Sequence, residues 1–274
     1  MSRKTHYLLA VLAVAALVAL AVHLARPRAL LGLLVCGLAS SLLAYLVGYR
    51  VGRERRARSR ARERRAGDAE QAKVDRFHSL YYDSGVFAKT SWLGVPTLKC
   101  PLDLWVYQEI MQEVRPEVIV ECGTAHGGSA LYLAWLCESL GKGEVITLDV
   151  EEKAGRPRHP RIAYLRGSSV APEVVEQVKR ALADRAPVMV LLDSDHSKDH
   201  VLAELRIYGE LVTPGSYLIV EDTNLGHPVG PDFGPGPMEA VEEFLAERGD
   251  FARDRSREKF LLTFNPGGYL RKLS

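Results

Sequence analysis

The feature that most constrains the fold is a regular alternation of short β-rich runs and helical stretches in the second half of the chain. The β-rich runs are Val118–Glu121, Val145–Asp149, Ile162–Leu165, Val188–Asp193, Tyr217–Glu221 and Phe260–Phe264. Most of them are separated by stretches with helical character, at 128–140, 172–183, 198–211 and 237–248. Because parallel strands need long crossover connections, this pattern predicts an α/β fold with a doubly wound, mostly parallel sheet.

Two more helices are expected before the first strand, at 69–82 and 101–114, with a loop-like stretch from Gly85 to Cys100 between them. Apolar residues recur at helical spacing in the second of these helices. We therefore expect an N-terminal helical cap segment over 69–114 and a catalytic domain over 115–274.

Polar and glycine residues follow the first three strands, where parallel sheets bind their ligands. The first strand leads into the stretch Glu121-Cys122-Gly123-Thr124-Ala125-His126-Gly127-Gly128-Ser129. Its glycines allow close approach of a ligand, and the next helix offers free N–H groups. It is neither a Walker loop nor a complete G-x-G-x-x-G motif, so an ordinary tight turn remains the alternative. Asp149 ends the second strand and suits a pair of ribose hydroxyls, with a helix-capping or surface role as the alternative, and Ser168 and Ser169 follow the third strand.

Acidic residues follow the next two strands. The fourth strand ends in Asp193-Ser194-Asp195-His196-Ser197-Lys198, and the fifth in Glu221-Asp222-Thr223-Asn224. Adjacent strand ends lie close together, so Asp195, Glu221 and Asp222 are expected to converge, and three carboxylates repel one another unless a cation lies between them. Oxygen ligands favour Mg²⁺, Mn²⁺ or Ca²⁺. The alternative is that these carboxylates cap helices or pair with arginine.

Several ordered motifs resemble the bacterial cephalosporin hydroxylase / rhamnosyl O-methyltransferase family. They are Trp92-Leu93-Gly94 followed by Lys99-Cys100-Pro101-Leu102-Asp103, Glu121-x-Gly123-x-x-x-Gly127-Gly128-Ser129, Asp193-Ser194-Asp195-His196-Ser197, and Gly215-Ser216-Tyr217-x-x-Val220-Glu221-Asp222-Thr223. The resemblance covers approximately residues 75–272. It implies a Rossmann-like class I methyltransferase that uses S-adenosylmethionine and a divalent metal, Mg²⁺ or Mn²⁺.

The resemblance also implies roles for individual residues. Glu121 and Gly123 would border the methionine part of the cofactor, Ser129 its carboxylate, Asp149 its ribose, and Ser168 or Ser169 its adenine. Gly127 and Asp193 complete the expected cofactor-binding set, and Asp195, Glu221 and Asp222 match the metal positions of the family.

A local likeness to catechol O-methyltransferase suggests a general base. The D-H-S-K-D stretch from Asp195 to Asp199 is similar to D-H-W-K-D in that enzyme, which implies a metal at Asp195 and a base at Lys198. The second cluster departs from it, because Glu221 and Asp222 stand where that enzyme has Asp-Asn, so a catechol substrate is not implied. His196, His200 and His227 are the alternative bases, with an ordinary structural role as the other explanation for each.

The expected function is methyl transfer from S-adenosylmethionine to a hydroxyl group of a sugar, a lipid-linked glycan or a secondary metabolite. Two alternatives are open: an iron-dependent oxygenase, as the older family name suggests, and a non-catalytic membrane scaffold that retains the fold. The expected partners are the hydroxyl acceptor, the membrane and, as a possibility, a second copy of the chain.

The membrane expectation comes from the distribution of charge. Residues 1–65 hold 13 basic and two acidic residues, a net charge of +11, whereas the remainder carries −9. Two uncharged 19-residue runs, 7–25 and 29–47, predict a transmembrane hairpin over 1–49. The Arg-rich linker at 50–68 predicts a cell-membrane protein with two spans and a cytoplasmic catalytic domain. A signal peptide and nucleic-acid binding are the weaker explanations, and no nucleic acid is expected as a partner.

Overall fold

The computed structural model describes residues 67–274 together with isolated positions nearer the N-terminus. The chain divides into two compact units, 1–70 and 71–274, and the second unit carries the features described below. Residues 67–83 are helical, which confirms the predicted helix at 69–82. A 3₁₀ turn at Val86–Lys89 and a small hairpin of β1 (Ser91–Trp92) and β2 (Val95–Pro96) then fill the expected loop.

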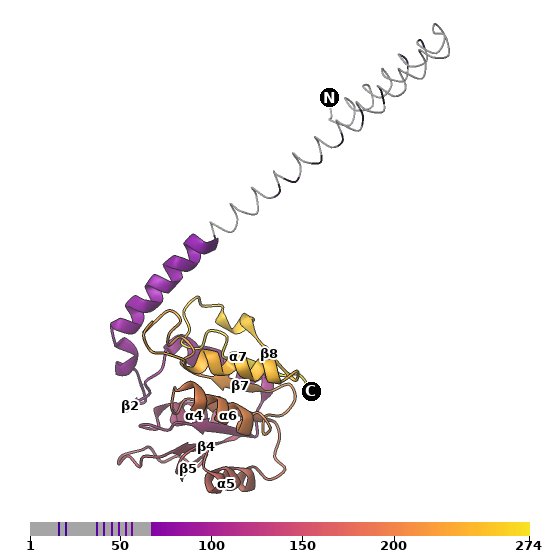
Figure 1. Ribbon diagram of the computed structural model, residues 1–274. Helices are drawn as coiled ribbons and strands as arrows, with labels where there is room; N and C mark the ends of the chain where they lie inside the picture. The colour runs from indigo at the N-terminus through magenta and orange to yellow at the C-terminus, as the bar shows by residue number, and fades with distance from the viewer. Residues whose placement is uncertain are drawn as a thin grey trace. The chain divides into compact units, whose positions relative to one another are not determined.

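The centre of the second unit is a seven-stranded sheet (Figure 1). Its strands are β3 (Val118–Cys122), β4 (Glu144–Asp149), β5 (Ile162–Arg166), β6 (Val188–Leu192), β7 (Tyr217–Val220), β8 (Phe251–Arg253) and β9 (Tyr269–Lys272). In the order β5-β4-β3-β6-β7-β9-β8, the first five are parallel, β9 is antiparallel to β7, and β8 is antiparallel to β9. The doubly wound, mostly parallel sheet is confirmed, and its order reverses between β3 and β6, where such sheets bind ligands.

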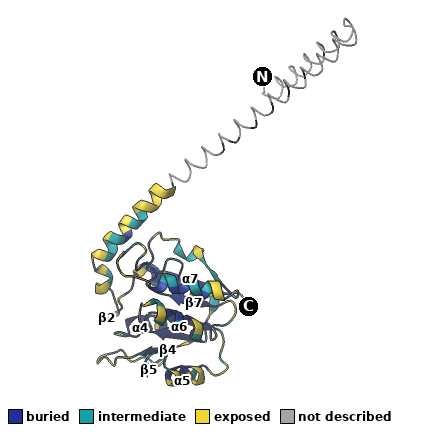
Figure 2. Cartoon of the chain, in the orientation of Figure 1, coloured by how far each residue is buried: buried dark blue, intermediate teal, exposed yellow. Residues whose placement is uncertain are grey.

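Five helices cover the two faces of the sheet. They are α3 (Pro101–Val114), α4 (Gly128–Ser139), α5 (Pro172–Leu182), α6 (Lys198–Tyr208) and α7 (Pro237–Glu247). On one face of the sheet, a buried apolar cluster packs α3 and α4 against the strands. On the other face, a second cluster packs α5, α6 and α7 against the strand side chains that alternate with the first. Every residue of β3 and β6 is buried, as expected for central parallel strands covered on both sides. Figure 2 shows the buried residues, in dark blue, concentrated in the sheet and on the helix surfaces that face it.

The predicted strand at Phe260–Phe264 is wrong, because the last two strands are β8 and β9. Phe264 instead packs into an aromatic cluster, its ring stacked on His78 with the ring centroids 5.8 Å apart. Its backbone N–H donates to Asp103 Oδ2 at 2.9 Å, so that group is not available to a neighbouring strand. Phe264 therefore serves packing against the 67–83 helix, whereas Phe260 is exposed.

The N-terminal predictions fall on residues of which the structure describes little. The hairpin at 1–49, with its spans at 7–25 and 29–47, and most of the linker at 50–68 lie outside the described residues. Within the part of the chain that is described, no helix combines the length and the apolar character needed to cross a bilayer. The helix at 67–83, for example, carries charged residues at Asp68, Glu70, Lys73, Asp75 and Arg76. This finding contradicts the predicted localisation as a two-span cell-membrane protein.

Candidate active site

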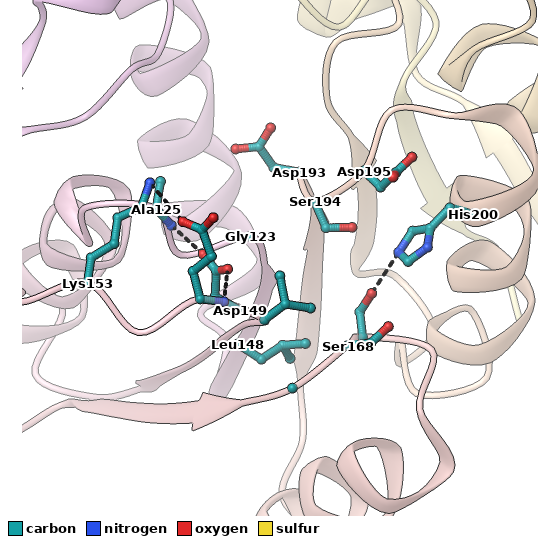
Figure 3. Close-up of a pocket in the computed structure, with 14 residues that line it drawn as sticks. Gly123, Ala125, Leu148, Asp149, Lys153, Ser168, Asp193, Ser194, Asp195 and His200 are labelled. Atoms are coloured by element: carbon teal, nitrogen blue, oxygen red, sulfur yellow. Dashed lines mark hydrogen bonds and ion pairs between the residues drawn. The ribbon is translucent and has the colours of Figure 1, made fainter.

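A cleft of about 380 Å³ opens at the carboxyl ends of β3, β4, β5 and β6. Six of the predicted site residues line it: Gly123, Asp149, Ser168, Ser169, Asp193 and Asp195. Figure 3 shows Asp149 on one side of the cleft and His200, from α6, on the other. The cleft therefore occupies the point where the strand order reverses, as expected for a ligand site in this architecture.

The floor of the cleft depends on a glycine after β3. Gly123 has a φ of +101°, and a Cβ atom built on it would lie 1.8 Å from the carbonyl oxygen of Asp193. A second glycine, Gly128 at the start of α4, would place a Cβ atom 2.2 Å from the carbonyl oxygen of Pro96. These two close approaches bring the loops after β2, β3 and β6 together, which explains why the predicted glycine-rich loop needs residues without side chains.

Asp149 is fixed at the end of β4. Its carboxylate accepts hydrogen bonds from the backbone N–H of Ala125 at 2.8 Å and of Glu151 at 2.9 Å, and Arg156 lies 3.2 Å from Oδ2. These contacts hold a hydrogen-bond acceptor at the edge of the cleft. The position suits the predicted contact with ribose hydroxyls.

Three other predicted cofactor residues lie beside the cleft. Glu121 is buried and accepts a hydrogen bond from Thr147 Oγ1 at 2.6 Å, while its second oxygen has no partner among the described residues. Burial raises the pKa of Glu121, and Lys99 and the Ser129 hydroxyl oppose that effect. Ser129 is buried in the first turn of α4, and Gly127 has a φ of +79° at the helix N-cap. None of these three residues is among those that line the cleft itself.

The loops after β5 and β6 are both tied to α6. Ser169 Oγ lies 3.0 Å from His200 Nε2, and the Ser194 hydroxyl donates to Glu204 at 2.6 Å. Glu204 is fully buried, and its hydrogen bond raises the pKa of His200. This network holds the Ser168 and Ser169 side of the cleft in place.

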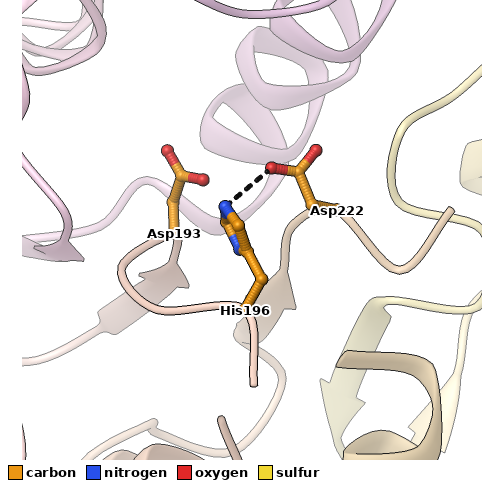
Figure 4. Close-up of side chains that lie close together, drawn as sticks. All are labelled: Asp193, His196 and Asp222. Atoms are coloured by element: carbon orange, nitrogen blue, oxygen red, sulfur yellow. Dashed lines mark ion pairs between the residues drawn. The ribbon is translucent and has the colours of Figure 1, made fainter. Parts of the chain in front are cut away.

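A second group of side chains meets next to the cleft. Potential metal-ligating atoms of Asp193, His196 and Asp222 all lie within 4.8 Å of one another (Figure 4). His196 Nε2 is 3.3 Å from Asp222 Oδ2. Asp193 also lines the cleft, so it joins the two halves of the site.

The strand ends explain which acidic residues converge. The backbone N–H of Glu221 donates to the carbonyl of Leu192 at 3.0 Å, which places Asp193 and Glu221 side by side as the first residues after β6 and β7. Asp222 follows with a φ of +55°, in the left-handed region that non-glycine residues adopt at a cost of about 1 kcal/mol or more. Burial, with the neighbouring Asp193 charge, raises the pKa of Asp222 to about 6, and burial raises the pKa of Glu221 well above its ordinary value.

Lys99 is the functional residue that sequence reasoning did not single out. Its side chain is 6% exposed, and its ammonium group pairs with Asp193 and lies 2.6 Å from Glu221 Oε2. Burial acts to lower the pKa of Lys99, but Asp193 and Glu221 outweigh it and raise the pKa. One feature of the sequence could have drawn attention to Lys99. It is a cation next to the N-terminus of α3, where positive charge is unfavourable, so a compensating negative charge is expected nearby.

Asp195 lies apart from the acidic group, which consists of Asp193, Glu221 and Asp222. Its Oδ1 accepts a hydrogen bond from the backbone N–H of Ser197 at 2.7 Å, just before α6 begins, and the residue is exposed. Hydrogen bonding by the Ser197 hydroxyl, and next by the Ser197 backbone N–H, lowers the pKa of Asp195. The structure therefore brings together Asp193, His196 and Asp222, with Glu221 joined to Asp193 through Lys99, rather than the predicted set of Asp195, Glu221 and Asp222.

Lys198, the predicted general base, lies in the first turn of α6 and pairs with Glu243 of α7, its Nζ 2.7 Å from Oε2. The hydrogen bond to Glu243 raises the pKa of Lys198, which is opposite to what a neutral general base requires. We expect Lys198→Met to change kcat by less than about threefold. Initial-rate measurements at saturating substrates check this, and a loss of about a hundredfold or more would restore Lys198 as the base.

The fold is shared with solved methyltransferases. A structure of CmcI with Mg and SAM superposes with a TM-score of 0.53 at 23% sequence identity, covering 68% of this chain and 78% of that one. An apo structure of CmcI gives the same TM-score, covering 68% and 77%. At this level of identity the likeness establishes the architecture, an α/β methyltransferase fold.

Sequence comparison is more specific. Residues 84–273 match the Rhamnosyl O-methyltransferase/CmcI family. A rhamnosyl O-methyltransferase of Mycobacterium tuberculosis is 41% identical over 208 residues, which cover 73% of this chain and 84% of the relative. Another, from Mycobacterium leprae, is 42% identical over 205 residues, covering 72% and 89%. The chain belongs to this family and is an S-adenosylmethionine-dependent O-methyltransferase, as its motifs predict.

Proposed function

We propose that the chain methylates a hydroxyl group of a sugar, with a divalent metal held by Asp193, Glu221 and Asp222 and with His196 as the general base. The observation that carries this proposal is the convergence of Asp193, His196 and Asp222 beside the cofactor cleft. A metal, a base and a cofactor methyl group in one place are what O-methylation of an unactivated hydroxyl requires.

The donor set fits a hard divalent cation. The Oε1 atom of Glu221 is buried and has no hydrogen-bond partner among the described residues, and Asp193 and Asp222 supply further carboxylate oxygens. Such oxygens suit Mg²⁺ or Mn²⁺. Bound there, the ion would supply Lewis-acid chemistry that lowers the pKa of the acceptor hydroxyl and orients it.

The cleft suits S-adenosylmethionine. Gly123 lets the backbones of the β3 and β6 loops meet, Asp149 offers an acceptor for the ribose hydroxyls, and Ser168 and Ser169 edge the far end. The cofactor supplies the electrophilic methyl group. The protein would orient the cofactor toward Asp193, which belongs to both the cleft and the acidic group.

His196 is placed to accept the hydroxyl proton. With Nε2 facing Asp222 at 3.3 Å, Nδ1 is the nitrogen left to take the proton, and the Asp222 carboxylate stabilises the imidazolium that results. In this proposal His196, oriented by Asp222, takes the role of general base that the sequence predicted for Lys198. The ammonium group of Lys198 is instead paired with Glu243.

A second pocket favours a polar acceptor. It measures about 200 Å³, and its polar lining residues are Gln71, Asp75, His78, His227, Glu258 and Thr263. His78 Nε2 lies 3.0 Å from Nδ2 of Asn224, which follows Asp222 by two residues. A lining rich in hydrogen-bonding groups suits a sugar, and the curated relatives are named for a rhamnosyl acceptor.

Methyl transfer to a rhamnosylated acceptor tests the proposal. The full chain is incubated with S-adenosylmethionine, the acceptor and Mg²⁺, and the products are identified by mass spectrometry. We expect a product that has gained one methyl group on a hydroxyl, with turnover lost in excess chelator and restored by Mg²⁺. Full activity in chelator would refute the metal, and gain of an oxygen atom would favour the hydroxylase alternative.

A further inference from the structure

Asp103 is a buried acidic residue to which the proposed mechanism gives no role. It lies in the first turn of α3 and is 2% exposed. Its Oδ2 accepts a hydrogen bond from the backbone N–H of Phe264 at 2.9 Å, and its Oδ1 accepts from the hydroxyls of Thr263 and Tyr269. Burial raises the pKa of Asp103, and these hydrogen bonds oppose that effect. The carboxylate therefore anchors the segment that begins at Thr263 to the start of α3.

The anchored segment, residues 263–268, lies against the loop that follows β7. The backbone N–H of Val220 donates to the carbonyl of Gly268 at 2.9 Å, and the N–H of Asn224 donates to the carbonyl of Phe264 at 3.1 Å. A Cβ atom built on Gly268 would lie 2.2 Å from the carbonyl oxygen of Val220, so the two backbones are in close contact. The loop after β7 is thus held at both of its ends by the anchored segment.

Asn265 contacts the residue between those two ends. It is fully buried, and its Oδ1 accepts a hydrogen bond from the backbone N–H of Asp222 at 3.2 Å. Asp222 has a φ of +55°, and its carboxylate lies 3.3 Å from His196 Nε2. The backbone N–H of Asn265 donates to Thr263 Oγ1 at 3.0 Å, and its Nδ2 donates to the Tyr107 hydroxyl at 2.8 Å. A left-handed conformation at a residue other than glycine persists where surrounding contacts determine it, and Asn265 supplies such a contact.

We propose that Asn265 is a positioning residue for the active site and that Asp103 is its anchor. Asp103 fixes the Thr263 hydroxyl, which in turn fixes the backbone of Asn265. The side chain of Asn265 then holds Asp222 in its left-handed conformation, with the carboxylate beside His196. This inference rests on the proposed function, in which Asp222 takes part in catalysis. It concerns the backbone of Asp222 and does not depend on which ligand the carboxylate binds.

The test compares Asn265→Ala with Tyr107→Phe in the full-length chain. Both variants lose the hydrogen bond between Asn265 Nδ2 and the Tyr107 hydroxyl, but only Asn265→Ala also loses the contact with Asp222. We expect Asn265→Ala to lower kcat for methyl transfer about a hundredfold and to keep the Kd for S-adenosylhomocysteine within about threefold of wild type. Tyr107→Phe should lose a similar amount of Tm while its kcat stays within about threefold. Equal kcat values in the two variants would overturn the inference.

A double-mutant cycle shows whether Asn265 acts through Asp222. In an Asp222→Asn background, Asn265→Ala should lower kcat by less than about threefold further, because the group that it positions is already lost. Effects that multiply in the double variant would overturn the positioning role alone. Wild-type kcat in Asp222→Asn would instead overturn the proposed function, and this inference with it.

Asp103→Asn tests the anchor separately, and it also serves if Asn265→Ala does not fold. The variant keeps an oxygen for the hydroxyls of Thr263 and Tyr269, but an amide nitrogen cannot accept the hydrogen bond from the backbone N–H of Phe264. We expect kcat to fall about tenfold, with the Kd for S-adenosylhomocysteine unchanged. An unchanged kcat would overturn the anchoring role of Asp103.

Discussion

Asp193→Asn is expected to lower kcat for methyl transfer by about a hundredfold to a thousandfold. Asp193 contributes to the acidic group and lines the cofactor cleft, so the change removes one charged donor from the centre of the site. The near-identical shape of Asn preserves the backbone contact with Gly123, so the fold should remain intact. Steady-state kinetics with and without added Mg²⁺, together with circular dichroism, measure both properties.

Asp195→Asn is the matched control for this prediction. Asp195 is two residues away and lines the same cleft, but it binds the N–H of Ser197 instead of joining the acidic group. We expect its kcat to stay within about threefold of wild type, because a neutral side-chain oxygen can still accept that hydrogen bond. The reverse ranking of the two variants would show that the sequence-based metal assignment to Asp195 is right and the arrangement in the structure is not the active one.

Gly123→Ala should be the most damaging substitution for stability. A Cβ atom at this position would lie 1.8 Å from a backbone oxygen, and the residue has a φ that favours glycine. Because backbone cannot move aside as a flexible side chain does, we expect a loss of about 3 kcal/mol or more in the free energy of unfolding, with loss of cofactor binding. Urea denaturation followed by fluorescence or circular dichroism provides the measurement.

Gly141→Ala separates the steric effect from the backbone effect. Gly141 also has a positive φ, +74°, but nothing lies within 4 Å of a Cβ atom built there. Its cost should therefore be limited to backbone strain, about 1 kcal/mol. If Gly123→Ala were no more destabilising than Gly141→Ala, the close packing of the β3 and β6 loops would not be a requirement of the cleft.

The sheet was predictable because its central strands are short apolar runs between helices. The predicted bounds of β3 and β4 differ from the observed ones by one residue at one end, and α3 begins and ends where predicted. The last strands were not predictable in the same way. The aromatic run at Phe260–Phe264 has strand-like composition, but the Phe264 ring packs on the 67–83 helix and the Phe264 backbone N–H donates to Asp103.

The site was predictable only in part, for a geometric reason. The expectation that acidic residues meet beyond neighbouring strand ends holds for Glu221 and Asp222. The choice of Asp195 followed from its place after the fourth predicted strand and from the family resemblance, whereas β6 ends at Leu192 and makes Asp193 the neighbour of Glu221. Lys99 lies far from these residues in sequence, so only the packing of the β2 loop against the sheet brings it to them.

Titration of the full-length chain with S-adenosylmethionine in the presence of Mg²⁺ tests the central claim most directly. Calorimetry should detect one site per chain, S-adenosylhomocysteine should compete for it, and Gly123→Ala should abolish it. Absence of cofactor binding in folded wild-type protein would contradict the account and leave a scaffold that retains only the fold.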